Sequence, residues 1–304
     1  MPPENPASQS TSTLAVTGAT GHLGRLLVQD LLRRGVPAGR IVALARDPAK
    51  GGDLSAKGVQ VRRADYEDGA SLRDALRGVD RLLLVSATDV GQRARQHRNV
   101  LEAAQAAGVR HLAYTSILHA DRAQTILAGE HRETEQAIRA SGVPFTFLRN
   151  GWYLENYTGN LGPALQYGVL MGCADGGKVS AAMRAEFAEA AANVLSSPGH
   201  EGRVYELGGD EPFTMAELAA WVAEASGKPV QYQDMPEDAY RQALAGFGLP
   251  EPLARALADA DRGLARGELV TSSGDLRKLL GRAPASPRHA VQAAVRARAA
   301  SPTA

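Results

Sequence analysis

The chain has 304 residues, 44% of them hydrophobic, which is enough for one large α/β core or for a core with a smaller appendage. Its 34 basic and 33 acidic residues are mixed along the chain and give a formal net charge of +1, which argues against nucleic acid or an anionic membrane surface as a partner. No apolar run approaches the ~20 residues of a membrane-spanning helix, so we expect no membrane insertion.

The amino-terminal residues and the cysteine content bear on the cellular compartment. Residues 1–13 are rich in Pro, Ser and Thr and carry neither the basic nor the apolar region of a signal peptide, so we expect a flexible tail there. The single cysteine, Cys173, cannot form an internal disulfide. These features predict a cytoplasmic protein.

A glycine-rich turn near the amino terminus connects an apolar strand, beginning at residue 14, to a helix with leucines at helical spacing. Glycines three residues apart let the backbone turn tightly and approach a pyrophosphate, and the following helix N-terminus presents free N–H groups. The segment predicts a dinucleotide-binding loop. Its predicted cofactor-binding residues are Gly18, Ala19, Thr20, Gly21, His22, Leu23 and Gly24.

Short apolar strands then alternate with Ala- and Leu-rich helical patterns as far as residue 150. This alternation predicts an α/β fold of the Rossmann type, a doubly wound parallel sheet that forms an NADP(H)-binding domain over residues 14–150. The predicted strands span 40–45, 59–61, 82–85, 111–115 and 145–148, and helical patterns include 71–76, 95–107 and 130–140.

The pattern loosens beyond Asn150 into Gly- and Pro-containing segments with longer helices. We expect residues 151–304 to form a smaller, mainly helical substrate-binding region, with a strand near 204–207 that returns to the main sheet. Helices are predicted at 215–225, 239–245, 253–260 and 289–300.

Arg46 directly follows the second predicted strand, where a Rossmann fold contacts the adenosine ribose. An acidic residue there selects a free 2′-hydroxyl, whereas a guanidinium binds a 2′-phosphate. Asp47 competes for the role, but Asp47 followed by Pro48 has the form of a helix N-cap with proline at the first helical position. The pattern favours NADPH, with NADH weaker by about one to two decades. The alternative is that Arg46 is a solvated surface charge.

Small and polar residues follow the next three predicted strands, at the edge where ligands of open α/β sheets collect. Asp65 could hold the adenine amino group, and small residues at 86 and 87 would let a dinucleotide lie against the backbone, although short loops often contain such residues. The residues after the fifth strand would border the nicotinamide. The predicted cofactor-binding residues of this group are Asp65, Tyr66, Ser86, Ala87, Thr88, Thr115 and Ser116.

None of the eight tyrosines has a lysine four residues further on, so a Tyr-x-x-x-Lys acid and base pair is absent. This argues against reversible alcohol oxidation and favours reduction of an electron-poor acceptor. His131 stands where a helix would supply that lysine, and it could position the nicotinamide ribose or donate a proton to the product. The alternative is a histidine on a helix surface. The remaining histidines have no metal-ligand spacing, and we expect no metal.

The segment after the sixth strand brings a glycine, amides and aromatic rings to the same edge. Aromatic faces can sandwich a planar ligand while amide groups fix its oxygens. The segment therefore predicts a site for a planar ligand, and its candidate residues are Asn150, Gly151, Trp152, Tyr153 and Asn156. The alternative is a hydrophobic hinge that packs the two halves together, for which Trp152 is the strongest candidate.

At these motifs the sequence resembles the NmrA-like branch of atypical short-chain dehydrogenases/reductases over residues 14 to about 280. Within that branch it is similar to the type 2 NAD(P)H:quinone oxidoreductases, with triphenylmethane reductases as near relatives. The resemblance implies a flavin-free enzyme that binds NADPH and passes hydride to quinones, with Asn156 near the hydride path. It also implies that Asn150, Gly151, Trp152 and Tyr153 contact the cofactor, and Trp152, Tyr153 and Asn156 the substrate. His22 departs from the Gln that the resemblance leads us to expect. The supporting motifs lie at 17–24, 90–94, 96–100, 114–116, 118–121, 130–135 and 148–157.

We therefore expect transfer of hydride from C4 of NADPH to a small-molecule quinone, giving a hydroquinone, with Asn156 and His131 as candidate donors to the quinone oxygen. One alternative is a non-enzymatic NADP(H) redox sensor of the NmrA-like type. Another is an NADPH-dependent reductase of a different flat conjugated acceptor, such as a triphenylmethane dye. A monomer and a homodimer are both compatible with the sequence.

Overall fold

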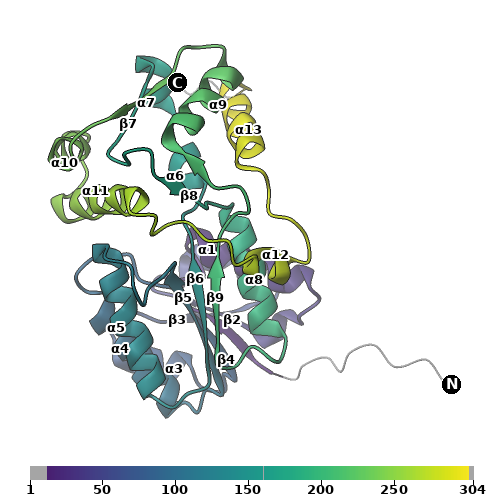
Figure 1. Cartoon of the computed structure of the whole chain (residues 1–304). Helices are drawn as coiled ribbons and strands as arrows, with labels where there is room; N and C mark the ends of the chain where they lie inside the picture. Colours follow the sequence, from purple (N-terminus) through teal and green to yellow (C-terminus); the bar gives the residue numbers. More distant parts are fainter. Residues whose placement is uncertain (1–11, 160, 301–304) are drawn as a thin grey trace.

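The computed structural model describes residues 12–159 and 161–300 (Figure 1). The predicted tail lies outside these residues except for Ser12 and Thr13. The Thr13 N–H donates to Asp80 Oδ2 at 2.7 Å, and its carbonyl accepts from the N–H groups of Asp80 and Arg81. The chain is therefore paired with the main body at Thr13, before the first strand begins.

A seven-stranded parallel sheet with the order β3-β2-β1-β4-β5-β6-β9 forms the centre of the larger lobe. The doubly wound sheet is thus confirmed, and β9 pairs with β6 at its edge. Because the chain order reverses between β1 and β4, the loops that leave their carboxyl ends diverge and open a crevice there. The strands are β1 Leu14–Val16, β2 Ile41–Ala45, β3 Gln60–Arg63, β4 Arg81–Leu84, β5 His111–Ile117, β6 Phe145–Asn150 and β9 Arg203–Leu207.

Helices cover both faces of this sheet, which explains why its central strands β1, β2 and β4 are almost wholly apolar, whereas the edge strands β3 and β9 carry charged residues. Helices α3 (Gly69–Ala75), α4 (Arg93–Ala106) and α5 (Ile126–Ala140) lie on one face, and α1 (His22–Arg33) and α8 (Arg184–Ser196) lie on the other (Figure 1). Short helical turns η1 Ala38–Arg40, η2 Pro48–Gly51 and α2 Gly52–Ser55 connect the first strands.

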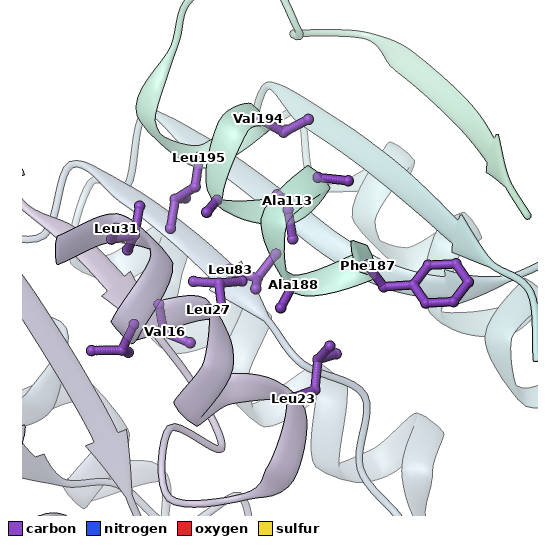
Figure 2. Close-up of a cluster of buried hydrophobic side chains, with 14 of the residues drawn as sticks. Val16, Leu23, Leu27, Leu31, Leu83, Ala113, Phe187, Ala188, Val194 and Leu195 are labelled. Atoms are coloured by element: carbon purple, nitrogen blue, oxygen red, sulfur yellow. The ribbon is translucent and has the colours of Figure 1, made fainter. Parts of the chain in front are cut away.

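Helices α1 and α8 pack against each other over the sheet (Figure 2). Leu23, Leu27 and Leu31 form the buried stripe of α1 that its helical spacing predicts, and they lie against the stripe of α8 that contains Phe187. Helix α8 comes from the second half of the chain. The second half of the chain therefore contributes a helix and the strand β9 to the larger lobe. The two lobes of the fold do not correspond simply to the residues before and after residue 150.

The smaller lobe is mainly helical, but it also contains two two-stranded sheets that the sequence analysis missed. Strand β7 (Val169–Gly172) pairs with β11 (Gln231–Asp234), and β8 (Lys178–Val179) pairs with β10 (Phe213–Thr214). Strands of two to four residues are too short to show alternation, and their partners lie far along the chain. The helices are α6 Glu155–Thr158, α7 Gly162–Tyr167, α9 Met215–Ser226, α10 Glu237–Gly246, α11 Glu251–Ala265, α12 Asp275–Leu280 beside α8, and α13 Pro287–Ala300.

Candidate functional site

A cleft of about 830 Å³ runs along the carboxyl edge of the sheet and is lined from both lobes. Nearly every site residue predicted from the sequence lines it, and only Ala19 does not. The predicted residues that line the cleft are Gly18, Thr20, Gly21, His22, Leu23, Gly24, Arg46, Asp65, Tyr66, Ser86, Ala87, Thr88, Thr115, Ser116, His131, Asn150, Gly151, Trp152, Tyr153 and Asn156.

The glycine loop lies closely against the N-terminal turn of α1 and lines the cleft. Gly18 has φ +58°, and a Cβ on Gly24 would lie 2.4 Å from the carbonyl oxygen of Gly18. Gly21 is the N-cap of α1, and no side chain caps the helix, so its first N–H groups are available for an anion. Ala19 serves the loop differently, because it is buried and its N–H donates to the carbonyl of Leu44 at 3.1 Å.

Arg46 and Asp47 have different surroundings, as the sequence predicts. The side chain of Asp47 accepts from the N–H of Ala49 at 3.1 Å, with Pro48 at the start of the turn η2, so Asp47 is an N-cap. Arg46 is exposed and lines the cleft, and no described residue forms an ion pair with it. Its guanidinium is therefore available at the end of β2.

At the same end of the cleft, Gln96 is a lining residue that the sequence analysis did not select. Its Nε2 donates to Glu67 Oε1 at 2.8 Å and to Asp89 Oδ2 at 2.9 Å, which fixes the orientation of the amide. Its Oε1 is buried and has no hydrogen-bond partner among the described residues. Asp65, by contrast, already accepts from the N–H of Glu67 at 3.0 Å. Gln96 thus offers a free acceptor beside the predicted adenine contact.

The loop after β4 is held by side chains behind it. The N–H of Ser86 donates to Thr115 Oγ1 at 2.8 Å, and the N–H of Ala87 donates to His97 Nε2 at 2.9 Å. His97 Nε2 is therefore the unprotonated nitrogen, and Nδ1–H donates to Thr134 Oγ1 at 3.0 Å. Burial lowers the pKa of His97 to about 3, so the ring is neutral. Thr115 and His97 make this part of the cleft wall rigid.

His131 is buried in the cleft wall and pairs with Tyr114. Its Nδ1 lies 2.6 Å from the Tyr114 hydroxyl. Burial holds the pKa of His131 well below its ordinary value and raises the pKa of Tyr114, so both groups are neutral. A neutral imidazole keeps one N–H, and when the Tyr114 hydroxyl donates to Nδ1 that proton is on Nε2. The arrangement fits a positioning role for His131 better than a role as proton donor, and no local signal in the sequence pairs it with Tyr114.

The segment after β6, which the sequence assigns to an acceptor, also lines the cleft. Asn150 is buried, and its Oδ1 has no hydrogen-bond partner among the described residues. Ser116 Oγ donates to Glu135 Oε1 at 2.7 Å. Trp152 lines the cleft and also packs against the cores of both lobes, so it combines the two roles that the sequence left open. The Asn156 side chain is exposed.

Three further lining residues lack a signal in the sequence. The Arg184 guanidinium lies 4.9 Å from the centroid of the Tyr153 ring, and Leu253 reaches the cleft from α11. Arg93 is buried and its Nη1 donates to Glu130 Oε2 at 2.5 Å.

In the described ranges there is no group of three or more metal-ligating side chains, and no helix is long and apolar enough to cross a membrane.

Comparisons with known proteins agree with this geometry. Residues 10–268 match the NmrA-like family. The chain is 52% identical over 268 residues to quinone oxidoreductase 2 of Escherichia coli strain K12, covering 88% of this chain and 93% of that protein.

Two solved structures of complexes extend the comparison. NADPH-dependent quinone oxidoreductase 2 of Escherichia coli complexed with NADPH has a TM-score of 0.89 and 50% identity, covering 92% of this chain and 99% of that one. Triphenylmethane reductase of Citrobacter sp. complexed with NADP(H) has a TM-score of 0.87 and 39% identity, with the same coverage.

Proposed function

The chain belongs to the NmrA-like family, and on that premise we propose that it is an NADPH-dependent quinone oxidoreductase that works without flavin or metal. The observation that carries the proposal is the continuous cleft. It joins the uncapped N-terminus of α1 to the aromatic segment after β6, so one ligand can place its phosphates at the helix and a ring beside an acceptor.

The lining residues fit NADPH at three points. The N–H groups at the start of α1 and the close approach of Gly24 to Gly18 suit a pyrophosphate. Arg46 offers a guanidinium for the 2′-phosphate. The unpartnered Oδ1 of Asn150 offers an acceptor for a carboxamide or hydroxyl donor, which removes the cost of burying that oxygen alone.

Bound NADPH supplies a hydride from C4 of its nicotinamide. The protein contributes position and hydrogen bonds: the neutral ring of His131 keeps one N–H donor at the cleft wall, and Trp152 and Tyr153 present aromatic faces to a flat acceptor. Asn156 is exposed beside them and donates to the acceptor oxygen. A proton from water completes the hydroquinone.

Turnover of purified protein tests the proposal. NADPH and 1,4-benzoquinone should give multiple turnovers, followed by the loss of NADPH absorbance, without added flavin or metal. Titration with NADP⁺ and NADPH in parallel separates the enzyme from a redox sensor, which would discriminate the two oxidation states and show no multiple turnover. A triphenylmethane dye as acceptor tests the breadth of the acceptor site.

Arg46→Glu should lower the preference for NADPH over NADH by about ten- to a hundredfold, because it replaces an attraction to the 2′-phosphate with a repulsion. The measurement is kcat/KM for both cofactors at fixed quinone. Lys57→Glu reverses an exposed charge outside the cleft and should leave the ratio unchanged. Unchanged Michaelis constants for both cofactors in Arg46→Glu would refute the phosphate contact.

Asn156→Ala should lower kcat for the quinone by about ten- to a hundredfold, because a donor to the developing oxyanion is lost. The Kd of NADPH should stay within about twofold, since the side chain is exposed and is assigned to the acceptor. Gln136→Ala, an exposed amide of α5 outside the cleft, is the control. A larger change in NADPH affinity than in kcat would move Asn156 to the cofactor site.

A further inference from the structure

Arg184 brings a positive charge to the acceptor end of the cleft. It is the first residue of α8, and its guanidinium carbon lies 4.9 Å from the centroid of the Tyr153 ring, within the range of a cation–π interaction. The backbone explains the contact, because Tyr153 pairs with Ala182 in a parallel bridge. The segment that enters α8 therefore lies beside the segment that leaves β6.

The charge of Arg184 is not neutralised by an ion pair with any described residue. The nearby carboxylate of Glu155 instead accepts from the backbone N–H of Arg184, at 2.9 and 3.0 Å. The other two cations of the cleft differ: Arg93 is paired with Glu130, and Arg46 lies at the end of β2. Arg184 is thus the cation available where the aromatic segment would hold an acceptor.

Hydride transfer creates a need for such a charge. The C4–H bond of NADPH breaks, a new bond to hydrogen forms on the quinone, and the electron pair ends on a quinone oxygen as a hydroquinone monoanion. A proton from water then gives the hydroquinone, and the dinucleotide leaves oxidised as NADP⁺. The neutral imidazole of His131 and the amide of Asn156 carry no positive charge to offset that anion.

We propose that Arg184 stabilises the negative charge that develops on the acceptor oxygen, and this inference rests on the proposed function. A guanidinium held on an aromatic face is pre-positioned, so little reorganisation is needed when the charge appears. This stabilisation matters most for acceptors whose own substituents stabilise the oxyanion poorly, and it matters least for strongly electron-poor quinones.

Kinetics of Arg184→Gln with quinones of graded electron affinity test the proposal. We expect kcat/KM to fall by about tenfold for the most electron-poor quinone and by about a hundredfold for the least, with Arg184→Lys recovering part of the loss. The Kd of NADPH should not change. Arg255→Gln removes an exposed charge of α11 outside the cleft and should leave all these values unchanged.

Ligand binding gives a readout that does not depend on turnover. The anion 4-nitrophenolate carries its charge on a phenolic oxygen, as the reduced acceptor does. It should bind the NADP⁺ complex of Arg184→Gln about tenfold more weakly than it binds the NADP⁺ complex of the wild type, whereas neutral nitrobenzene should bind both complexes equally. Equal losses for every quinone, unchanged phenolate binding, or a raised Kd of NADPH would each overturn the proposal. A wild-type chain that reduces no quinone would overturn the proposed function, and the phenolate comparison would still decide whether Arg184 binds anions.

Discussion

Gly24→Val is expected to abolish NADPH binding, with a Kd at least about a hundredfold higher than that of the wild type. A Cβ at position 24 would lie 2.4 Å from the oxygen and 2.8 Å from the carbonyl carbon of Gly18, and 2.9 Å from Ala19 Cα. These are backbone atoms, so the loop must move as a unit. That movement displaces the N-terminus of α1 from the position where it meets a pyrophosphate.

The measurement is calorimetric titration with NADPH, with thermal unfolding as a check that the variant folds. Overpacking at Gly24 should also cost about 1–3 kcal/mol of stability. Gly39→Ala is the matched control, because no atom lies within 4 Å of its Cβ position, and its Kd should stay within about twofold. A folded Gly24→Val that binds NADPH normally would show that the loop does not hold the pyrophosphate.

Acid should destabilise this protein already between about pH 6 and 5, because three buried histidines are held neutral. Burial lowers the pKa of His97 to about 3 and that of His111, which also faces Arg81, to about 4, and it lowers the pKa of His131 strongly. Above the ordinary pKa of 6.5 these histidines are neutral in both the folded and the unfolded chain, so they do not oppose folding. As the pH falls below 6.5 the unfolded chain takes up protons that the folded chain does not, and the free energy of unfolding decreases.

The expected slope follows from the protons taken up on unfolding. Between about pH 6 and 5 the unfolded chain binds up to three more protons on these histidines, worth up to about 4 kcal/mol per pH unit. Burial raises the pKa of Asp261 to about 6, so the folded state gains a proton in the same window and the net slope falls to about 3 kcal/mol per pH unit. His119, whose pKa is raised by Glu206, acts in the opposite sense, and its contribution is lost as the pH rises.

Urea unfolding at about pH 7, 6 and 5 measures this slope. His111→Gln should reduce it by about one proton, or ~1.4 kcal/mol per pH unit, whatever its effect on absolute stability. His289→Gln, at an exposed histidine, should leave the slope unchanged. A stability that does not change between pH 7 and 5 would mean that the buried histidines are not neutral in the folded protein.

The parts of the fold and site that could be predicted from the sequence are those whose signal is local. The glycine loop, the alternation of strands and helices, and Arg46 directly after a strand each depend on neighbouring residues. The Asp47 cap is another example, because a side chain, a proline and a turn lie within three positions. In each case one short segment contains both the residue and the reason for its role.

Other features depend on segments that are far apart in the chain. The partner of Tyr153 is Arg184 on a different helix, the partner of His131 is Tyr114 on a strand, and the pairing of β7 with β11 has no periodic pattern behind it. The cofactor loop could therefore be predicted from the sequence, whereas the position of the Arg184 cation could not.

By itself, then, the sequence determined the fold class, and it predicted the dinucleotide loop and the preference for NADPH. Only the tertiary structure decided the neutral state of His131, the unpartnered Oδ1 of Asn150 and the position of Arg184. The physical reason is that a pKa or an unpaired oxygen is set by burial and by the groups within a few ångströms. Those groups are brought together by packing between distant segments, which no local periodicity encodes.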